Sequence, residues 1–151
     1  MINRYMELAL AEAYTGIELG DGGPFGCVIV RDGKIVGTGH NQVVGTNDVT
    51  AHGEMVAIRD ACKALNTFDL SGCELYTTGY PCPMCMSAIR WANISKVYYG
   101  CNTSDTESIG FRDKLFEETD PENTVEFIEY GRQECLKLYD KYRNKTNKIN
   151  Y

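Results

Sequence analysis

The chain has 151 residues, of which 43% are hydrophobic and 24% are charged, a balance typical of a globular domain and not of a disordered chain. This length fits one domain with a hydrophobic core, and no apolar run approaches the roughly 20 residues that cross a bilayer. The formal net charge of −6 argues against a nucleic-acid backbone as the main partner.

The N-terminal third predicts a helix followed by a hairpin. Apolar residues recur at three- and four-residue spacing over 2–19, with no signal-peptide core, so we expect a cytoplasmic protein. The stretch "GDGGPFG" ends that helix. Apolar and β-branched residues on both sides of Asp32-Gly33 predict a hairpin over 27–39, and the polar segment 40–50 predicts a loop.

Helices and strands alternate over the rest of the chain. The pattern predicts helices over 51–65, 81–92 and 131–145, strands over 73–78, 95–101 and 124–130, and irregular or short-helical structure over 102–123. Pro83 fits the first turn of the second of these helices. This order indicates a single α/β domain in which a mixed sheet lies between helices.

Seven cysteines are an odd number and form no disulfide framework. We interpret five of them as small buried apolar residues: Cys27, Cys62, Cys73, Cys101 and Cys135. The other two, Cys82 and Cys85, lie three residues apart at a predicted helix start. Taken alone, the pair fits a redox dithiol, two metal ligands or two neighbouring core residues.

An upstream stretch, "TAHGEMVAIRD", favours the metal. His52 and Glu54 lie in the first turn of a predicted helix, where side chains lean toward the N-terminus and can converge beyond the helix end. One imidazole and two thiolates form a three-ligand zinc site with a position left for water, whose protons Glu54 can handle. A redox pair leaves His52 and Glu54 unexplained. A structural zinc module needs a fourth ligand, such as Cys101 or His40, and leaves Glu54 without a role.

The segments "HGE" and "PCPMC" match the H-x-E and P-C-x-x-C signature, so the chain resembles the zinc-dependent nucleobase and nucleoside deaminases. Among these it looks most like the small bacterial guanine deaminases, on the segments "GGPFGCVIV", "NDVTAHGEMVAIRDAC", "PCPMCMSAIRWA" and "SIGFRD" and the terminal tyrosine. The resemblance implies a three-layer α/β/α sandwich with a five-stranded mixed sheet, and a homodimer.

The resemblance also implies a reaction and a set of site residues. The expected reaction is hydrolytic deamination of a free nucleobase, guanine to xanthine and ammonia, without nucleic acid or membrane. One zinc ion per chain is held by His52, Cys82 and Cys85 and activates water, while Glu54 shuttles protons. The implied substrate contacts are Asn41 on the ring, Phe25 and Trp91 on its faces, Asp113 on the amidine edge, Gly53 through its backbone N–H, and Tyr151 from a tail.

Two positions depart from the guanine deaminase pattern, which commonly has alanine at Gly53 and glutamate at Tyr80. "HGE" and "LYTT" also look like the fungal cytosine deaminases, so cytosine or another small amidine-bearing heterocycle is an alternative substrate. The locally basic "KYRNKTNK" leaves transfer-RNA adenosine as a third. We further expect residues 131–151 to form a C-terminal helix and tail that cap the active site, and exchange of tails between the two chains of a dimer is an extension of this expectation.

Overall fold

The computed structural model describes residues 1–118, 126 and 128–149. The chain divides into two compact units, Met1–Glu118 and Thr119–Tyr151, which are described separately. The first unit contains the sheet and six helices, and the described part of the second contains one helix. Within the described residues, no helix is both long and apolar enough to span a membrane.

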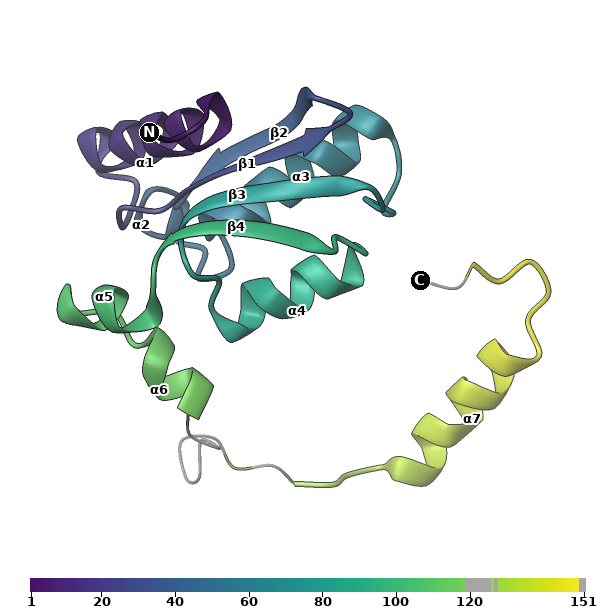
Figure 1. Ribbon diagram of the computed structural model, residues 1–151. Coiled ribbons are helices and arrows are strands. Elements are labelled where there is room, and N and C mark those ends of the chain that lie inside the picture. The colour runs from purple at the N-terminus through teal and green to yellow at the C-terminus, as the bar shows by residue number, and fades with distance from the viewer. Residues whose placement is uncertain (119–125, 127, 150–151) are drawn as a thin grey trace. The chain divides into compact units, whose positions relative to one another are not determined.

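A mixed four-stranded sheet forms the centre of the first unit (Figure 1). Its strands are β1 (Gly26–Arg31), β2 (Lys34–His40), β3 (Cys73–Gly79) and β4 (Lys96–Cys101), in the spatial order β2-β1-β3-β4. β1 runs antiparallel to both of its neighbours, whereas β3 and β4 are parallel. The β3–β4 crossover passes through a helix, as parallel pairing requires.

The predicted hairpin between β1 and β2 is confirmed. Asp32 and Gly33 both have positive φ, 49° and 74°, as a two-residue type I′ turn requires. The turn fixes the β1–β2 register, in which Arg31 lies opposite Lys34. Five of the six residues of β1 are buried, all except Arg31, so β1 is the most enclosed strand of the sheet.

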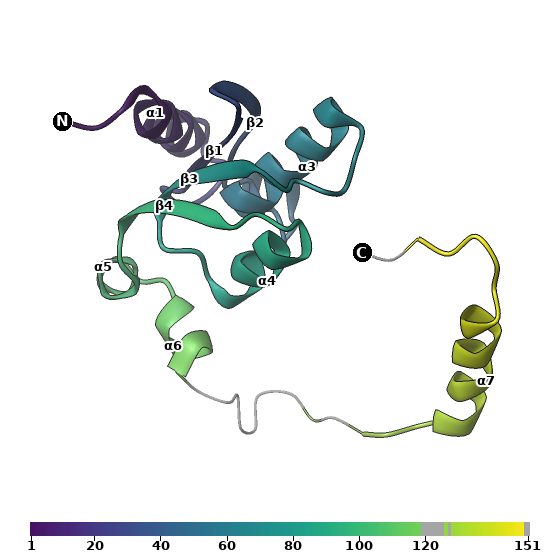
Figure 2. The ribbon, with the colours of Figure 1, turned by 45° about the vertical axis from the view of Figure 1, so that its right-hand side comes forward.

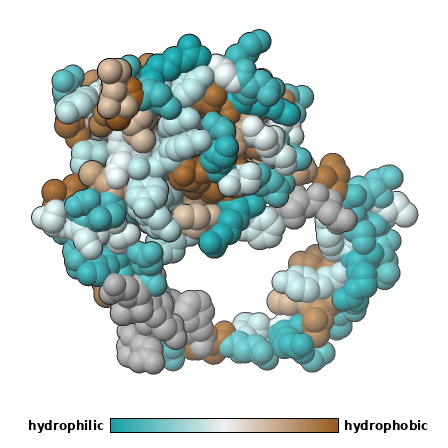
Figure 3. All heavy atoms as spheres, viewed as in Figure 1, coloured by the Kyte–Doolittle hydropathy of each residue, from teal (hydrophilic) through white to brown (hydrophobic). Residues whose placement is uncertain are grey.

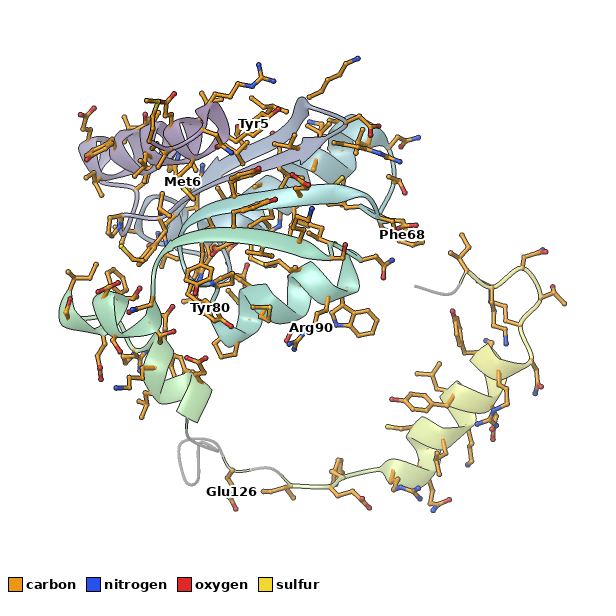
Figure 4. All side chains as sticks on the ribbon, in the orientation of Figure 1. Tyr5, Met6, Phe68, Tyr80, Arg90 and Glu126 are labelled. Carbon is orange, nitrogen blue, oxygen red and sulfur yellow. The ribbon has the colours of Figure 1, made fainter. Side chains whose placement is uncertain are left out.

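Helix α1 (Arg4–Leu19) covers one face of the sheet. It begins where the Asn3 side chain accepts hydrogen bonds from the N–H groups of Tyr5 and Met6, and it ends at Gly20 with φ 71°. Figure 4 shows Tyr5 and Met6 on the side of α1 next to the sheet, where they pack against a buried cluster that includes Val28. Apolar burial therefore orients α1.

Helices α3 (Gly53–Leu65) and α4 (Pro83–Trp91) cover the opposite face, which gives the predicted three layers (Figure 2). The larger buried cluster of the unit lies here, between these helices and the sheet: Cys27, Ile29, Ala57, Ala61, Leu70, Cys73, Leu75, Ile89, Ala92 and Ile94. A Cβ at Gly39 would lie 2.7 Å from the backbone nitrogen of Ala57. Because glycine has no side chain, Gly39 lets the backbone of α3 pack directly against the backbone of β2.

Two short helices each follow a strand, α2 (Val43–Thr46) after β2 and α5 (Thr103–Ser108) after β4, and a third, α6 (Asp113–Glu118), follows α5. α5 and α6 confirm the expected short-helical segment. α2 lies where the sequence predicts a loop. The N–H groups of Val44 and Gly45 donate to the Asp21 carbonyl oxygen, 2.9 Å away in each case, and this distant acceptor stabilises a turn that local sequence does not favour.

The described part of the second unit contains α7 (Arg132–Arg143), which confirms the predicted C-terminal helix. No residue of α7 is buried, and its exposed side chains include Leu138, Tyr139 and Tyr142. Figure 3 shows apolar side chains on α7 next to hydrophilic ones. The helix is thus amphipathic, with an apolar side that no described residue of its own unit buries.

Two expectations need correction. The described sheet has four strands instead of five: of the predicted strand 124–130, the structure describes residues 126 and 128–130, and these form no strand. Cys101 and Cys135 are exposed, whereas Cys27 and Cys73 are buried as expected and Cys62 is half-buried. Cys101 ends the edge strand β4 and Cys135 lies on α7, so neither position is enclosed.

Candidate metal centre and active site

The predicted metal ligands lie at the starts of two neighbouring helices. His52 is the N-cap residue of α3, Cys82 is the N-cap residue of α4, and Cys85 lies in the first turn of α4. Both N-cap residues have extended backbones, and neither uses its side chain to cap its own helix. The side chains therefore project beyond the helix ends, where unpaired N–H groups and the helix dipoles favour thiolates.

The three side chains converge as a zinc site requires. Their ligand atoms all lie within 4.8 Å of one another, and Cys82 Sγ lies 3.5 Å from His52 Nδ1. Bonds of about 2.0–2.3 Å at a tetrahedral angle place two ligand atoms roughly 3.6 Å apart. One imidazole and two thiolates also match the donor preference of zinc. The residues present therefore fit one zinc ion.

The two cysteine thiols have opposite pKa shifts. A hydrogen bond from the Cys85 thiol, together with one from His52, lowers the pKa of Cys82 to about 4. The same interaction with Cys82, reinforced by burial, raises the pKa of Cys85. Cys82 is therefore a thiolate at neutral pH, and the remaining proton is one that a metal ion displaces on binding.

Glu54, in the first turn of α3, places its carboxylate beside the ligands. The residue is 6% exposed, and Cys85 Sγ lies 3.4 Å from Glu54 Oε2. The other oxygen accepts a hydrogen bond from the Thr77 hydroxyl at 3.2 Å. Burial raises the pKa of the Glu54 carboxyl group above its ordinary value, because burial disfavours the charged form. A buried carboxyl group of this kind can both accept and return a proton.

A cavity of about 630 Å³ opens at this centre. Its volume suits a small planar molecule. The lining residues are Gly22, Gly23, Phe25, Asn41, Val43, Val44, Val49, His52, Glu54, Tyr80, Cys82, Pro83, Met84, Phe111, Arg112, Asp113 and Phe116. Apart from the metal centre, most of these side chains are apolar or aromatic, and a few polar groups converge among them.

Asn41 and Asp113 are the expected polar substrate contacts, and the structure brings both to the cavity. Asn41 is 5% exposed, and its Oδ1 accepts a hydrogen bond from the N–H of Val43 at 3.1 Å. Asp113 is half-buried at the start of α6, and burial raises the pKa of its carboxyl group. Both side chains are held in the wall by the local backbone.

Phe25 lines the cavity, and its ring meets the Phe111 ring edge to face at a centroid distance of 4.9 Å. Gly53 packs against the Phe25 backbone: a Cβ there would lie 3.1 Å from the Phe25 carbonyl oxygen. Glycine at position 53, where the guanine deaminase pattern commonly has alanine, therefore avoids a tight contact between a side chain and the Phe25 backbone. Gly53 is not among the cavity-lining residues.

The structure does not place Trp91 at the cavity. It is the last residue of α4, 64% exposed, and belongs to the helix end opposite the metal ligands. The role expected for Trp91 on a substrate face therefore stays a prediction, and Phe111 joins Phe25 as an aromatic residue of the described wall. Tyr151 lies outside the described residues.

Several lining residues were not predicted, among them Val43, Val44, Met84, Phe111 and Phe116. Val43 and Val44 belong to the short helix α2, which the sequence pattern does not indicate. Phe111 and Phe116 flank Asp113 in the sequence. The sequence feature that could have indicated these two lining residues is the presence of aromatic residues close to a polar residue in a segment that contains glycine.

Tyr80, the second departure, also lines the cavity. Figure 4 shows it just beyond β3, near the start of α4. Its ring packs edge to face on Tyr99 of β4 at 5.0 Å, and its N–H donates to the Cys101 carbonyl oxygen. An aromatic group thus occupies the wall at a position where the guanine deaminase pattern commonly has glutamate.

Comparison with known proteins supports this description. Residues 1–101 match the family described as the cytidine and deoxycytidylate deaminase zinc-binding region. The chain is 42% identical to the guanine deaminase of Bacillus subtilis over 97% of both chains. It is 35% identical to the tRNA-specific adenosine deaminase of Aquifex aeolicus over 93% of both.

The crystal structure of the Bacillus subtilis guanine deaminase superposes on this fold with a TM-score of 0.92, at 41% identity and 99% coverage of both chains. The matched family region contains the imidazole, the two thiols and the buried carboxylate described above. On this evidence, the chain belongs to the zinc-dependent deaminases of the cytidine and deoxycytidylate deaminase family.

Proposed function

We propose that this zinc-dependent aminohydrolase deaminates free guanine, with water, to xanthine and ammonia. The observation that carries the proposal is the buried carboxylate of Glu54, which lies beside the ligand Cys85 at the base of a cavity sized for a planar base. The similarity to a guanine deaminase over nearly the whole chain supports guanine in particular.

His52, Cys82 and Cys85 would hold the zinc ion, which would supply an activated water near neutral pH. Glu54 accepts a proton from that water as its oxygen bonds to C2 of guanine, and delivers the proton to N3. Glu54 then takes the remaining proton from the hydroxyl group now on C2 and gives it to the exocyclic amino group, which leaves as ammonia when the C2–N bond breaks and the C2 carbonyl forms. The carboxylate is regenerated within one turnover, so a single residue serves both as base and as acid.

The cavity wall supplies the contacts that orient the base. The Asp113 carboxylate accepts hydrogen bonds from N1–H and from the amino group, which is the donor pair that distinguishes guanine. Asn41 hydrogen-bonds the opposite part of the ring, and Phe25 packs on one ring face with Phe111 beside it. A site that buries such polar partners rejects substrates that lack them.

The deciding experiment is a panel of free bases, nucleosides and a transfer-RNA anticodon stem incubated with zinc-loaded protein, with ammonia release measured for each. Guanine is expected to react fastest and to yield xanthine. Cytosine as the preferred substrate would instead agree with the Gly53 and Tyr80 departures. Reaction only with a transfer-RNA anticodon stem would assign the chain to the other set of relatives, despite its net charge of −6.

Asp113→Asn tests the substrate contact directly. An amide cannot accept both hydrogen bonds from the amidine edge, so kcat/KM for guanine is expected to fall about a hundredfold or more. Glu117→Gln, an equal charge change at an exposed position of the same helix, is the control and is expected to leave kcat/KM unchanged. Equal kinetics of both variants would remove Asp113 from the substrate site.

We also propose that the enzyme is a cytoplasmic homodimer in which residues 131–151 complete an active site. Exposed Leu138, Tyr139 and Tyr142 on α7 favour burial against another surface, and the thiol ligands require a reducing compartment. A dimeric mass by light scattering is expected for the full chain.

Deleting residues 147–151 is expected to preserve zinc content and to lower kcat/KM sharply. Mixing Glu54→Gln chains with the truncated chains then distinguishes the two arrangements of the tail. Activity returns in hybrids only if a tail acts on the partner's site. Full activity of the truncated protein would show that the tail takes no part.

A further inference from the structure

A buried histidine outside the metal centre links three parts of the first unit. His40 is the last residue of β2 and is 9% exposed. Its Nδ1 lies 2.9 Å from Glu12 Oε2, and its Nε2 lies 2.8 Å from Asp21 Oδ2. Glu12 belongs to α1, and Asp21 follows the end of that helix. Both carboxylates are themselves largely enclosed, with side-chain exposures of 30% and 26%.

This geometry favours the protonated form of the His40 ring. A neutral imidazole has one N–H donor, whereas two carboxylate oxygens lie within hydrogen-bond distance of its two nitrogens. Only the imidazolium satisfies both acceptors. Burial alone lowers the pKa of His40, but the hydrogen bonds to Glu12 and Asp21 outweigh it and raise that pKa above the ordinary value.

The His40 ring also packs closely against helix α1. A Cβ at Gly16 of α1 would lie 2.7 Å from His40 Cδ2, so the ring rests directly on the helix backbone. The Asp21 carbonyl oxygen accepts the N–H groups of Val44 and Gly45, and the Asp21 N–H donates to the Gly16 carbonyl oxygen at 2.9 Å. His40 therefore joins α1, the loop after it and the start of α2.

These connections reach the substrate cavity through adjacent residues. Asn41 follows His40, and its N–H donates to the Phe25 carbonyl oxygen at 2.9 Å. Gly22 follows Asp21, and a Cβ there would lie 2.1 Å from Asn41 Oδ1. Gly22, Phe25, Asn41 and Val44 all line the cavity. His40 and its two carboxylate partners thus lie directly behind these four residues of the cavity wall.

We propose that the Glu12–His40–Asp21 bridge sets the position of Asn41 and of the adjoining wall, which makes His40 a positioning residue for base binding. The inference rests on the proposed deamination of a base. His40 touches no reacting atom, so it acts on binding more than on the chemical step.

The bridge makes base binding depend on pH in a defined direction. The charged groups that face His40 are Glu12 on α1 and Asp21 on the loop. α3 packs against the opposite side of β2, next to Gly39, and α2 carries no charged residue. As the pH rises through the pKa of His40, one nitrogen loses its hydrogen and faces a carboxylate without a donor. The bridge then opens and KM rises.

The test compares KM and kcat against pH for zinc-loaded wild type, His40→Gln and Asp21→Asn. His40→Gln is expected to raise KM about two- to thirtyfold at neutral pH with a smaller change in kcat, and to abolish the alkaline rise in KM. Asp21→Asn removes one stabilising charge, so the alkaline rise moves to lower pH. Glu7→Gln, which removes an exposed charge from the same helix, is the control with unchanged KM.

Imidazole NMR of the zinc-loaded protein provides a readout that is independent of activity. The chain has two histidines, and His52 is a metal ligand, so one titrating ring is expected. Its pKa should be raised in the wild type and lower in Asp21→Asn. An unraised pKa, or an unchanged KM in His40→Gln, overturns the inference. If His40→Gln does not fold, Asp21→Asn decides alone.

Failure of the proposed function would look different. Wild-type protein would then release no ammonia from guanine, while the NMR titration would still test the bridge. The KM series would be run on whichever base the panel identifies.

Discussion

The hydroxyl group of Thr77 lies 3.2 Å from Glu54 Oε1 and 3.1 Å from the carbonyl oxygen of Gly79. It has one hydrogen and therefore donates to only one of them at a time. When Glu54 is ionised, Thr77 can donate to the carboxylate. When Glu54 carries a proton, Thr77 can accept from it and donate to Gly79. Thr77 thus supports Glu54 in both of its states.

Thr77→Val is expected to lower kcat about ten- to a hundredfold, because a buried hydrogen bond to a charged group contributes about 1.5–3 kcal/mol. The shape of the side chain is preserved, so zinc content should not change. Thr77→Ser keeps the hydroxyl and should retain most of the activity. Steady-state kinetics of the two variants separate the hydrogen bond from packing, and equal loss in both would indicate packing.

Glu54→Gln should lower kcat by about 10²- to 10⁴-fold, because an amide neither accepts nor returns the proton. The fold and the zinc content should be preserved, since Glu54 is not among the three ligands. Metal analysis and turnover measured on one preparation check both statements. Near-normal turnover would mean that another group carries the proton.

Removal of zinc by a chelator should abolish activity and lower the thermal unfolding midpoint, and added zinc should restore both. One zinc per chain is expected at saturation. Acidification should weaken binding, because protons compete for His52 and the thiolates, and the lowered pKa of Cys82 makes it the thiol ligand that is protonated last. Metal content measured across a pH series tests this order, and full activity of metal-free protein would contradict it.

The His40 bridge also predicts how stability depends on pH. The pKa of His40 is raised in the folded state, so its stabilising contribution is complete below the unfolded-state pKa and is lost as the pH rises through the folded-state pKa. The unfolding midpoint of the wild type should exceed that of His40→Gln most on the acidic side of neutrality. The difference should shrink toward alkaline pH. Thermal unfolding of both zinc-loaded proteins between about pH 5 and pH 9 measures it.

The metal centre was predictable because its residues are tied to local signals. His52 and Cys82 both precede helices whose starts are visible in the sequence, and Pro83 marks one of them. The hairpin was equally visible, since Asp32-Gly33 is a turn sequence in its own right. A residue whose position follows from an adjacent turn or helix end can be placed without knowing the rest of the fold.

The cavity wall was not predictable in this way, because it depends on contacts between distant segments. Val44 reaches the wall through a hydrogen bond to Asp21, and Phe111 through packing on Phe25. Trp91 ends the helix that begins at the two cysteine ligands, so membership of that helix does not by itself place it at the cavity. The exposure of Cys101 likewise depends on β4 being the edge of the described sheet.

The glycines of the sheet have a consequence for redesign. Gly39 brings β2 against α3, and Gly26 brings β1 against α1, where a Cβ would lie 2.0 Å from the Ala9 carbonyl oxygen. Any larger residue there displaces a helix, and at Gly39 that helix begins at a metal ligand. Val43, Val44 and Phe111 instead lie on short helices and loops that cover the cavity. Libraries meant to broaden the range of accepted heterocycles should therefore vary this outer wall and leave the glycine-packed frame intact.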